Sequence, residues 1–127
     1  MSRQAISAPG ATAVGPYSHA VKANGLVYLS GQTPIDPATG RLADGDVARQ
    51  TRQCFSNLFN VLAAAGLTAD DVVNVQVYLT DMNDFEKMNA VYAEHFAEPY
   101  PARTTIGCAS LPLNARVEIG MIAKEPT

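Results

Sequence analysis

Two periods in the spacing of apolar residues divide the chain into expected strands and helices. In residues 73–79 apolar and polar residues alternate, which is the period of a strand with one buried face, here Val73, Val75, Val77 and Leu79. Between Asp46 and Gly66 apolar residues recur at steps of three and four, which predicts an amphipathic helix with Asp46 as its N-cap and Gly66 at its end. The stripe of this helix comprises Val47, Thr51, Cys54, Phe55, Leu58, Val61, Leu62 and Ala65.

Turn residues delimit the elements of the N-terminal third. The pair Asn24-Gly25 favours a two-residue hairpin turn and predicts two antiparallel strands, over residues 17–23 and 26–31. Residues 33–45 contain two prolines and two glycines, which is typical of a loop. The first third is therefore expected to be a hairpin followed by a loop that leads into the first helix.

The C-terminal half contains a second helix and two more strands. A helix is expected from about residue 84 to residue 97, ended by Pro99 and Pro101. Its stripe comprises Phe85, Met88, Asn89, Tyr92 and Phe96. Residues 103–109 and 116–123 are expected to pair as a C-terminal hairpin. The order of elements predicts an α+β fold in which two helices pack on one face of a mixed sheet.

The last two expected strands are apolar on both sides, and one layer of helices covers only one face of a sheet. A bare apolar sheet face favours aggregation, so we expect a second subunit to cover it. The length of 127 residues is typical of a single domain, here residues 1–127.

Composition and charge argue against several kinds of partner. The net charge is -3, and the nine Lys and Arg residues are scattered, so no nucleic acid partner is expected. No apolar run approaches the 18 residues or more of a membrane span, and the first ten residues lack the apolar core of a signal peptide. We therefore expect no membrane partner and a cytoplasmic location.

The sequence also gives no sign of a metal or a cofactor. Cys54 and Cys108 are far apart and are expected to be free thiols, with Cys54 in the core. Together with His19 and His95 they form no pair with metal-ligand spacing, so no metal site is expected. Nucleophile elbows, phosphate-binding glycine loops and dinucleotide fingerprints are absent from the sequence. Chemistry without a cofactor is what remains.

Two charged residues are candidates for such chemistry. Arg103 begins a strand after a loop, where its planar guanidinium could hold a carboxylate at two points, although many arginines in such positions are surface or salt-bridged residues. Glu118 lies in an apolar strand, where its carboxylate needs a partner or a raised pKa. An edge-strand glutamate facing water, or an ion pair with Arg116 or a lysine, is an equally open interpretation of Glu118.

Several polar residues are weaker candidates. A buried Asn89 needs hydrogen bonds, and its amide could fix a loop or touch a ligand. Tyr17, Ser30 and Gly31 offer a phenol, a hydroxyl and a closely approachable backbone amide.

Taken in order, five short strings resemble the RidA (YjgF) family of reactive intermediate deaminases over nearly the whole chain. They are GPYS at 15–18, LSGQTP at 29–34, DFEKMNAVY at 84–92, PARTT at 101–105, and LP at 111–112 with VEI at 117–119. The resemblance implies a chorismate-mutase-like fold assembled as a homotrimer with active sites between subunits. It also implies hydrolysis of enamines or imines, such as 2-aminoacrylate and 2-aminocrotonate, to 2-oxo acids and ammonia.

The same resemblance implies roles for individual residues. Arg103 would bind the substrate carboxylate, and Glu118 would place or activate the attacking water. Tyr17, Ser30, Gly31, Asn89 and Thr105 would line the substrate cleft. Some family members carry a cysteine where this chain has Thr105, so we expect no cysteine nucleophile; by strand parity Thr105 shares a face with Arg103.

Three other functions remain open at this point. A pathway-specific deaminase, for example one resembling 2-aminomuconate deaminase, would use the same arginine on a larger acid. An RNA-cleaving translation inhibitor is disfavoured by the acidic balance of the sequence. In a chaperone-like binding module, Arg103 and Glu118 would only pair with each other across the subunit interface.

Overall fold

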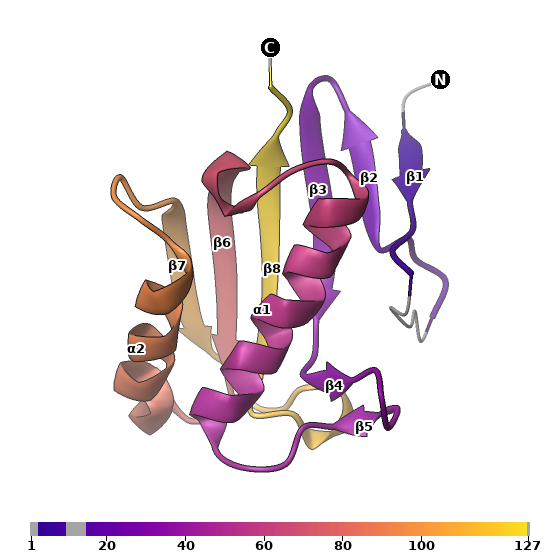
Figure 1. The fold of residues 1–127 in the computed structure, drawn as a ribbon. Coiled ribbons are helices and arrows are strands. Elements are labelled where there is room, and N and C mark those ends of the chain that lie inside the picture. The colour runs from indigo at the N-terminus through magenta and orange to yellow at the C-terminus, as the bar shows by residue number, and fades with distance from the viewer. Residues whose placement is uncertain (1–2, 10–14, 127) are drawn as a thin grey trace.

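A mixed sheet backed by two helices makes up the residues that the computed structural model describes, 3–9 and 15–126 (Figure 1). The sheet consists of β1 (Gln4–Ile6), β2 (Ala20–Ala23), β3 (Leu26–Gln32), β6 (Val72–Leu79), β7 (Ala102–Gly107) and β8 (Val117–Lys124). Their spatial order is β1-β2-β3-β8-β6-β7. The helices α1 (Val47–Ala64) and α2 (Phe85–His95) pack on one face, as the sequence predicts.

Short elements occupy the connections. The expected loop over residues 33–45 contains a two-stranded hairpin of β4 (Ile35–Asp36) and β5 (Arg41–Leu42). Further along the chain, 3-10 turns cover Ala69–Asp71, Met82–Asp84 and Pro112–Asn114. Strand β2 begins only at Ala20, so Tyr17 lies in the loop before it rather than in the strand. None of the described helices combines the length and the apolar character that crossing a membrane requires.

The core lies between the helices and one face of the central strands. Asp46 is the N-cap of helix α1, and its carboxylate accepts a hydrogen bond from the Arg49 amide at 3.1 Å. The expected stripe is buried except for Ala65, the half-buried C-cap residue. This stripe packs on alternate residues of β6 and β8, namely Val75, Val77, Leu79, Val117, Ile119 and Met121, which are at most 1% exposed. The two periods in the sequence therefore define the two layers of the core.

The expected C-terminal hairpin is wrong. Strand β7 pairs in parallel with β6, and β8 lies between β3 and β6, antiparallel to both. Helix α2 connects β6 to β7, and such a crossover places the second strand parallel to the first. Strand β8, apolar on both sides, takes the centre of the sheet, where both of its edges are paired.

The period of two in β6 also has one exception. A β-bulge between Val72 and Asn74 shifts the register, so Val72 is buried and Val73 is 44% exposed. A bulge adds one residue to a strand and moves the following side chain to the other face.

No helix or strand of the described residues covers the second face of the sheet (Figure 1). Side chains on this open face include Tyr28, Gln76, Tyr78, Ile106, Glu118 and Ile122. Tyr28 and Ile106 are 45% and 47% exposed. The open face is therefore partly apolar, as expected from the sequence.

Candidate active site

Arg103 lies on edge strand β7 beside Val75, so its side chain is on the face of the sheet that the helices cover. Its guanidinium carbon is 4.7 Å from the centre of the Tyr92 ring and 5.6 Å from that of Phe85, both on α2. Such distances are typical of cation–π contacts, which fix the guanidinium plane without using its N–H groups. No ion pair or hydrogen bond joins Arg103 to another described residue, so its donors can bind a carboxylate.

A pocket of about 350 Å³ opens beside this guanidinium, lined by Asn89, Tyr92, Ala93, Tyr100, Pro101 and Arg103. Two of the lining side chains carry buried oxygen atoms with no partner among the described residues, Asn89 Oδ1 and Tyr92 OH. Thr105 Oγ1, two residues along β7 and on the same face as Arg103, is a third such atom. Buried polar atoms normally have partners, so this cluster has the chemistry of a site for a polar ligand.

Glu118 lies on the opposite, open face. It lies on central strand β8, between the buried residues Val117 and Ile119, and its register partner is Tyr78 of β6. The edge-strand interpretation therefore does not apply. Burial raises the pKa of the Glu118 carboxyl. No ion pair is found for it among residues 3–9 and 15–126, and Arg116, the partner considered from the sequence, pairs with Asp84 instead.

A second β-bulge places Gly31 beneath the Glu118 carboxylate. Leu29 pairs with Met121 and Gln32 with Ile119, so β3 has one residue more than β8 in this interval. A Cβ atom on Gly31 would lie 2.5 Å from Glu118 Oε2, so only glycine leaves room for the carboxylate in this position.

Hydrogen bonds hold this bulge from both sides. Ser30 Oγ donates to the Ser18 carbonyl at 2.7 Å, and the Ser30 amide donates to the His19 carbonyl at 3.0 Å. From the core, Cys54 Sγ donates to the Gln32 carbonyl at 3.2 Å. Burial raises the pKa of the Cys54 thiol, which is therefore a structural donor rather than a nucleophile. The loop that carries Tyr17 is thus connected directly to Ser30, the residue before Gly31.

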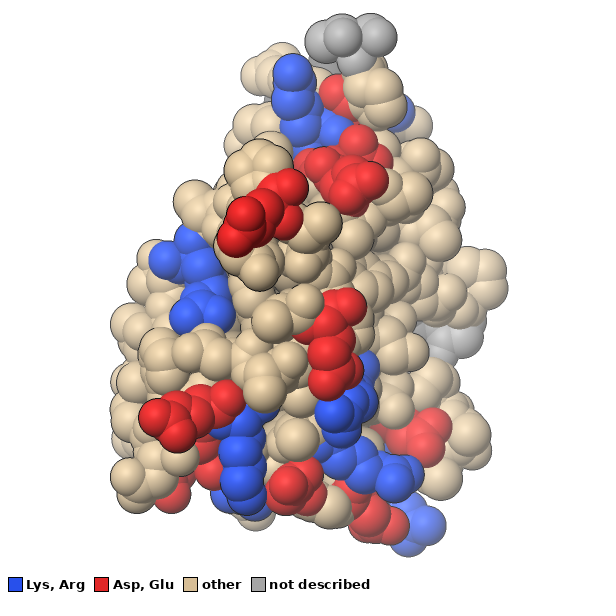
Figure 2. All heavy atoms as spheres, turned by 60° about the vertical axis from the view of Figure 1, so that its left-hand side comes forward, with Lys and Arg blue, Asp and Glu red and all other residues tan. Residues whose placement is uncertain are grey.

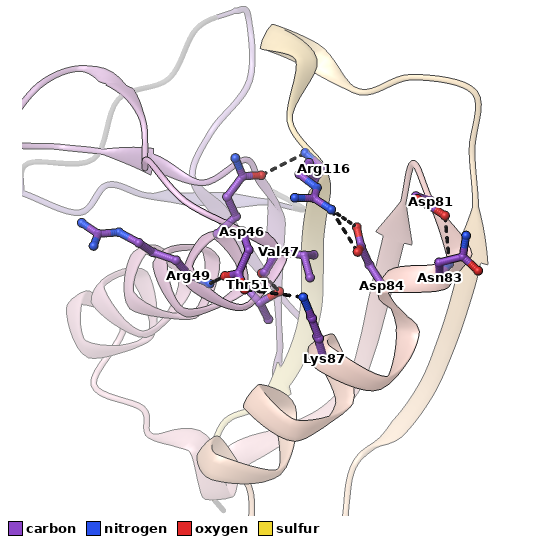
Figure 3. Close-up of polar contacts among 10 residues, drawn as sticks. Asp46, Val47, Arg49, Thr51, Asp81, Asn83, Asp84, Lys87 and Arg116 are labelled. Atoms are coloured by element: carbon purple, nitrogen blue, oxygen red, sulfur yellow. Dashed lines mark hydrogen bonds and ion pairs between the residues drawn. The ribbon is translucent and has the colours of Figure 1, made fainter.

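The start of β8 is anchored two residues before Glu118 (Figure 3). Arg116 Nη2 donates to both carboxylate oxygens of Asp84, at 2.9 and 3.0 Å, and Asp84 is the N-cap residue of α2. The Arg116 amide donates to Gln50 Oε1 of α1 at 3.0 Å. Both helices are therefore joined to the strand that carries Glu118, and Arg116 is not the partner of Glu118.

The candidate residues form two groups. Arg103, Asn89 and Thr105 gather on the helix side of β7, whereas Glu118 meets Gly31 on the open side, and Ser30, next to Gly31, is bonded to the loop that carries Tyr17. A single chain does not bring Arg103 and Glu118 into contact.

Residues 6–125 match the family model described as Endoribonuclease L-PSP, which represents the YjgF/RidA proteins. The chain belongs to the RidA family. A RutC family protein of Pyrococcus horikoshii is 50% identical over 110 residues, which are 87% of each chain. The chloroplastic Reactive Intermediate Deaminase A of Arabidopsis thaliana is 45% identical over 87% of this chain and 59% of its own length.

Solved RidA proteins have the same fold. The crystal structure of RidA from the Antarctic bacterium Psychrobacter superposes with a TM-score of 0.91 at 43% identity, covering 96% of this chain and 99% of that one. The α+β fold and the family expected from the sequence are thereby confirmed.

Sequence analysis missed the aromatic part of the RidA pocket. The apolar stripe of its helix predicts Tyr92 as a core residue, and no pattern in the sequence points to Tyr100. The available signal is spacing: Tyr92 follows Asn89 by three residues on α2, so two polar side chains share a helix face that is otherwise apolar.

Proposed function

We propose that this RidA protein hydrolyses 2-imino acids, specifically 2-iminopropanoate and 2-iminobutanoate, to 2-oxo acids and ammonia. These imines are tautomers of 2-aminoacrylate and 2-aminocrotonate. The observation that carries the proposal is the guanidinium of Arg103, held on two aromatic rings and without a partner in the described residues, beside a pocket. A relative that is named Reactive Intermediate Deaminase A supports the same reaction class.

In the proposed reaction Arg103 holds the substrate carboxylate through two N–H groups. Water adds to the C=N carbon and a proton passes to nitrogen, which gives a carbinolamine. Loss of ammonia from that carbinolamine leaves the 2-oxo acid. Glu118 orients the attacking water and accepts its proton, while the remaining catalysis is positioning. The balance is one imine and one water consumed, one 2-oxo acid and one ammonia formed, with no cofactor and no metal.

The proposal includes a homotrimer with the active sites between subunits. Arg103 and Glu118 lie on opposite faces of one sheet, so a site that uses both needs two copies of the chain. The open face, with Tyr28 and Ile106 exposed, is a surface that a second copy would cover. The proposal keeps the cytoplasmic location expected from the sequence.

The test couples the protein to a threonine dehydratase acting on serine or threonine, with semicarbazide as a competing trap for free imine. Wild type should raise the rate of 2-oxo acid formation, and Arg103→Ala should lose that effect while remaining folded. Arg52→Ala is the matched control, because the Arg52 side chain is 54% exposed and pairs on the surface with Glu94. Its activity should equal that of wild type. An inactive wild type would overturn the proposal.

One observation favours a second candidate, a deaminase for a larger acid such as 2-aminomuconate. The pocket of about 350 Å³ is within the range of roughly 300–1,000 Å³ that holds drug-sized ligands. A ratio of kcat/KM values that favours 2-aminomuconate over 2-iminobutanoate would select this candidate.

The RNA-directed and chaperone-like alternatives have less support. On the face that carries α2 and β7, acidic and basic side chains are interspersed, and no broad basic patch is visible (Figure 2). A nucleic acid site needs clustered positive charge. A chaperone-like module would require Arg103 only for stability, so the Arg103→Ala assay separates it from an enzyme.

A further inference from the structure

The Tyr92 side chain combines a well-packed ring with an unsatisfied hydroxyl. Its ring packs edge-on against Phe55 with ring centres 5.8 Å apart, and lies 4.9 Å from Phe96. Its hydroxyl is buried and has no hydrogen-bond partner among the described residues. Burial raises the pKa of the Tyr92 phenol more than the nearby charge of Arg103 lowers it, so the hydroxyl keeps its proton.

A buried phenol without a partner destabilises the free protein and needs an explanation. The hydroxyl belongs to a residue that lines the 350 Å³ pocket, together with Asn89 and Arg103. Asn89 Oδ1 is unsatisfied in the same pocket, so a donor and an acceptor remain there beside a free cationic fork. A small carboxylic acid with an N–H or O–H donor next to the carboxylate, such as a 2-imino acid, would satisfy all three: the carboxylate accepts from Arg103 and Tyr92, and the ligand donor bonds Asn89 Oδ1.

We infer that Tyr92 is a further substrate-binding residue: its ring holds the Arg103 guanidinium, and its hydroxyl donates a hydrogen bond to the bound acid. This inference rests on the proposed function for its turnover test, although its binding test is independent of turnover. The ring contact, at 4.7 Å, needs only an aromatic side chain, whereas the hydrogen bond needs the phenol oxygen.

Two substitutions separate these two roles. Tyr92→Phe keeps the ring and removes an unsatisfied buried hydroxyl, so its melting temperature should equal or exceed that of wild type. Its affinity for 2-oxobutanoate, the reaction product, should nevertheless fall by about tenfold or more, as expected for loss of a hydrogen bond to a charged group. Tyr92→Leu removes the ring as well, and should lose more affinity and some thermal stability.

Thr51→Val is a matched control. Thr51 is fully buried on α1, but its hydroxyl already donates to the Val47 carbonyl at 2.6 Å. Removing this satisfied hydroxyl should not raise the melting temperature and should leave the affinity for 2-oxobutanoate and kcat/KM unchanged. Opposite changes in stability and binding are therefore specific to a hydroxyl that faces a ligand.

Binding is measured by calorimetry with 2-oxobutanoate, and turnover by the dehydratase-coupled assay. Wild-type affinity or turnover in Tyr92→Phe would overturn the inference, as would a failure of wild type to bind 2-oxobutanoate. A wild type that binds 2-oxobutanoate through Tyr92 and Arg103, yet does not accelerate imine hydrolysis, would support the inference and overturn only the proposed function.

Discussion

Gly31→Ala tests whether the position of Glu118 matters for turnover. The new Cβ atom would lie 2.5 Å from Glu118 Oε2 and 3.2 Å from Cδ, whereas ordinary contacts begin at 3.4 Å. The backbone is not an obstacle, because Gly31 is not among the described glycines with positive φ. The carboxylate must therefore move by about 1 Å. Since it is the end of a flexible side chain, the protein should still fold with little loss of stability.

A displacement of about 1 Å in a catalytic group can lower kcat by roughly 100-fold, which corresponds to about 2.7 kcal/mol in the activation free energy. The KM should change much less, because Arg103 and not Glu118 is proposed to hold the substrate carboxylate. Steady-state kinetics in the dehydratase-coupled assay measure both constants, and thermal unfolding measures the stability of the same preparations.

A double-mutant cycle shows whether the effect acts through Glu118. In a Glu118→Gln background, which already lacks the carboxylate, Gly31→Ala should add little to the loss of kcat. Gly107→Ala is a control for the same chemical change at another strand residue, where the nearest atoms to the new methyl group belong to the side chain of Met82, at 3.1 Å, and the Leu79 carbonyl, at 3.8 Å. Equal losses from Gly31→Ala in both backgrounds, or a wild-type kcat in Gly31→Ala, would refute the reasoning.

Two further predictions concern charge. Because burial raises the Glu118 pKa, its neutral form is favoured on folding; the resulting stabilisation is present at low pH and is lost as the pH rises through the folded-state pKa. Glu118→Gln should therefore be at least as stable as wild type near neutral pH, and the difference in stability should be smaller in acid. In the pH profile of wild-type kcat/KM, the fall in acid should have its midpoint at a higher pH than the pKa of an ordinary glutamate. A midpoint at the ordinary glutamate pKa would contradict a carboxylate acting from this site. Asp84→Asn removes the partner of Arg116, whose side chain is 41% exposed, while that of Asp84 is only 8% exposed. Unfolding in denaturant should show that Asp84→Asn lowers the free energy of unfolding by about 1–2 kcal/mol. Glu94→Gln, in the exposed pair with Arg52, should lower it by less than about 1 kcal/mol. Equal losses would mean that the Asp84 pair is no more than a surface contact.

Local signals in the sequence are enough to predict the helices, most of β6 and one turn. Asp46, the stripe that follows it and Gly66 predict α1 to within a few residues, because capping and side-chain periodicity act within one helix. The same holds for α2 and for most of β6. Asn24 and Gly25 both have positive φ in the structure, as the hairpin turn between β2 and β3 requires. The candidate residues Arg103 and Glu118 came from charge in an apolar context, and from the family resemblance.

The pairing of these elements, and therefore which side chains meet, depends on contacts between segments that are distant in sequence. Pairing joins residues that are distant in sequence, so no local pattern shows that β8 lies between β3 and β6 rather than beside β7. The bulges at Val73 and Gly31 arise from that pairing, and they determine which face each side chain occupies. Packing between strands and helices also separates Arg103 from Glu118. The same packing leaves the Tyr92 hydroxyl without a partner beside Arg103. No local pattern in the sequence predicts either result.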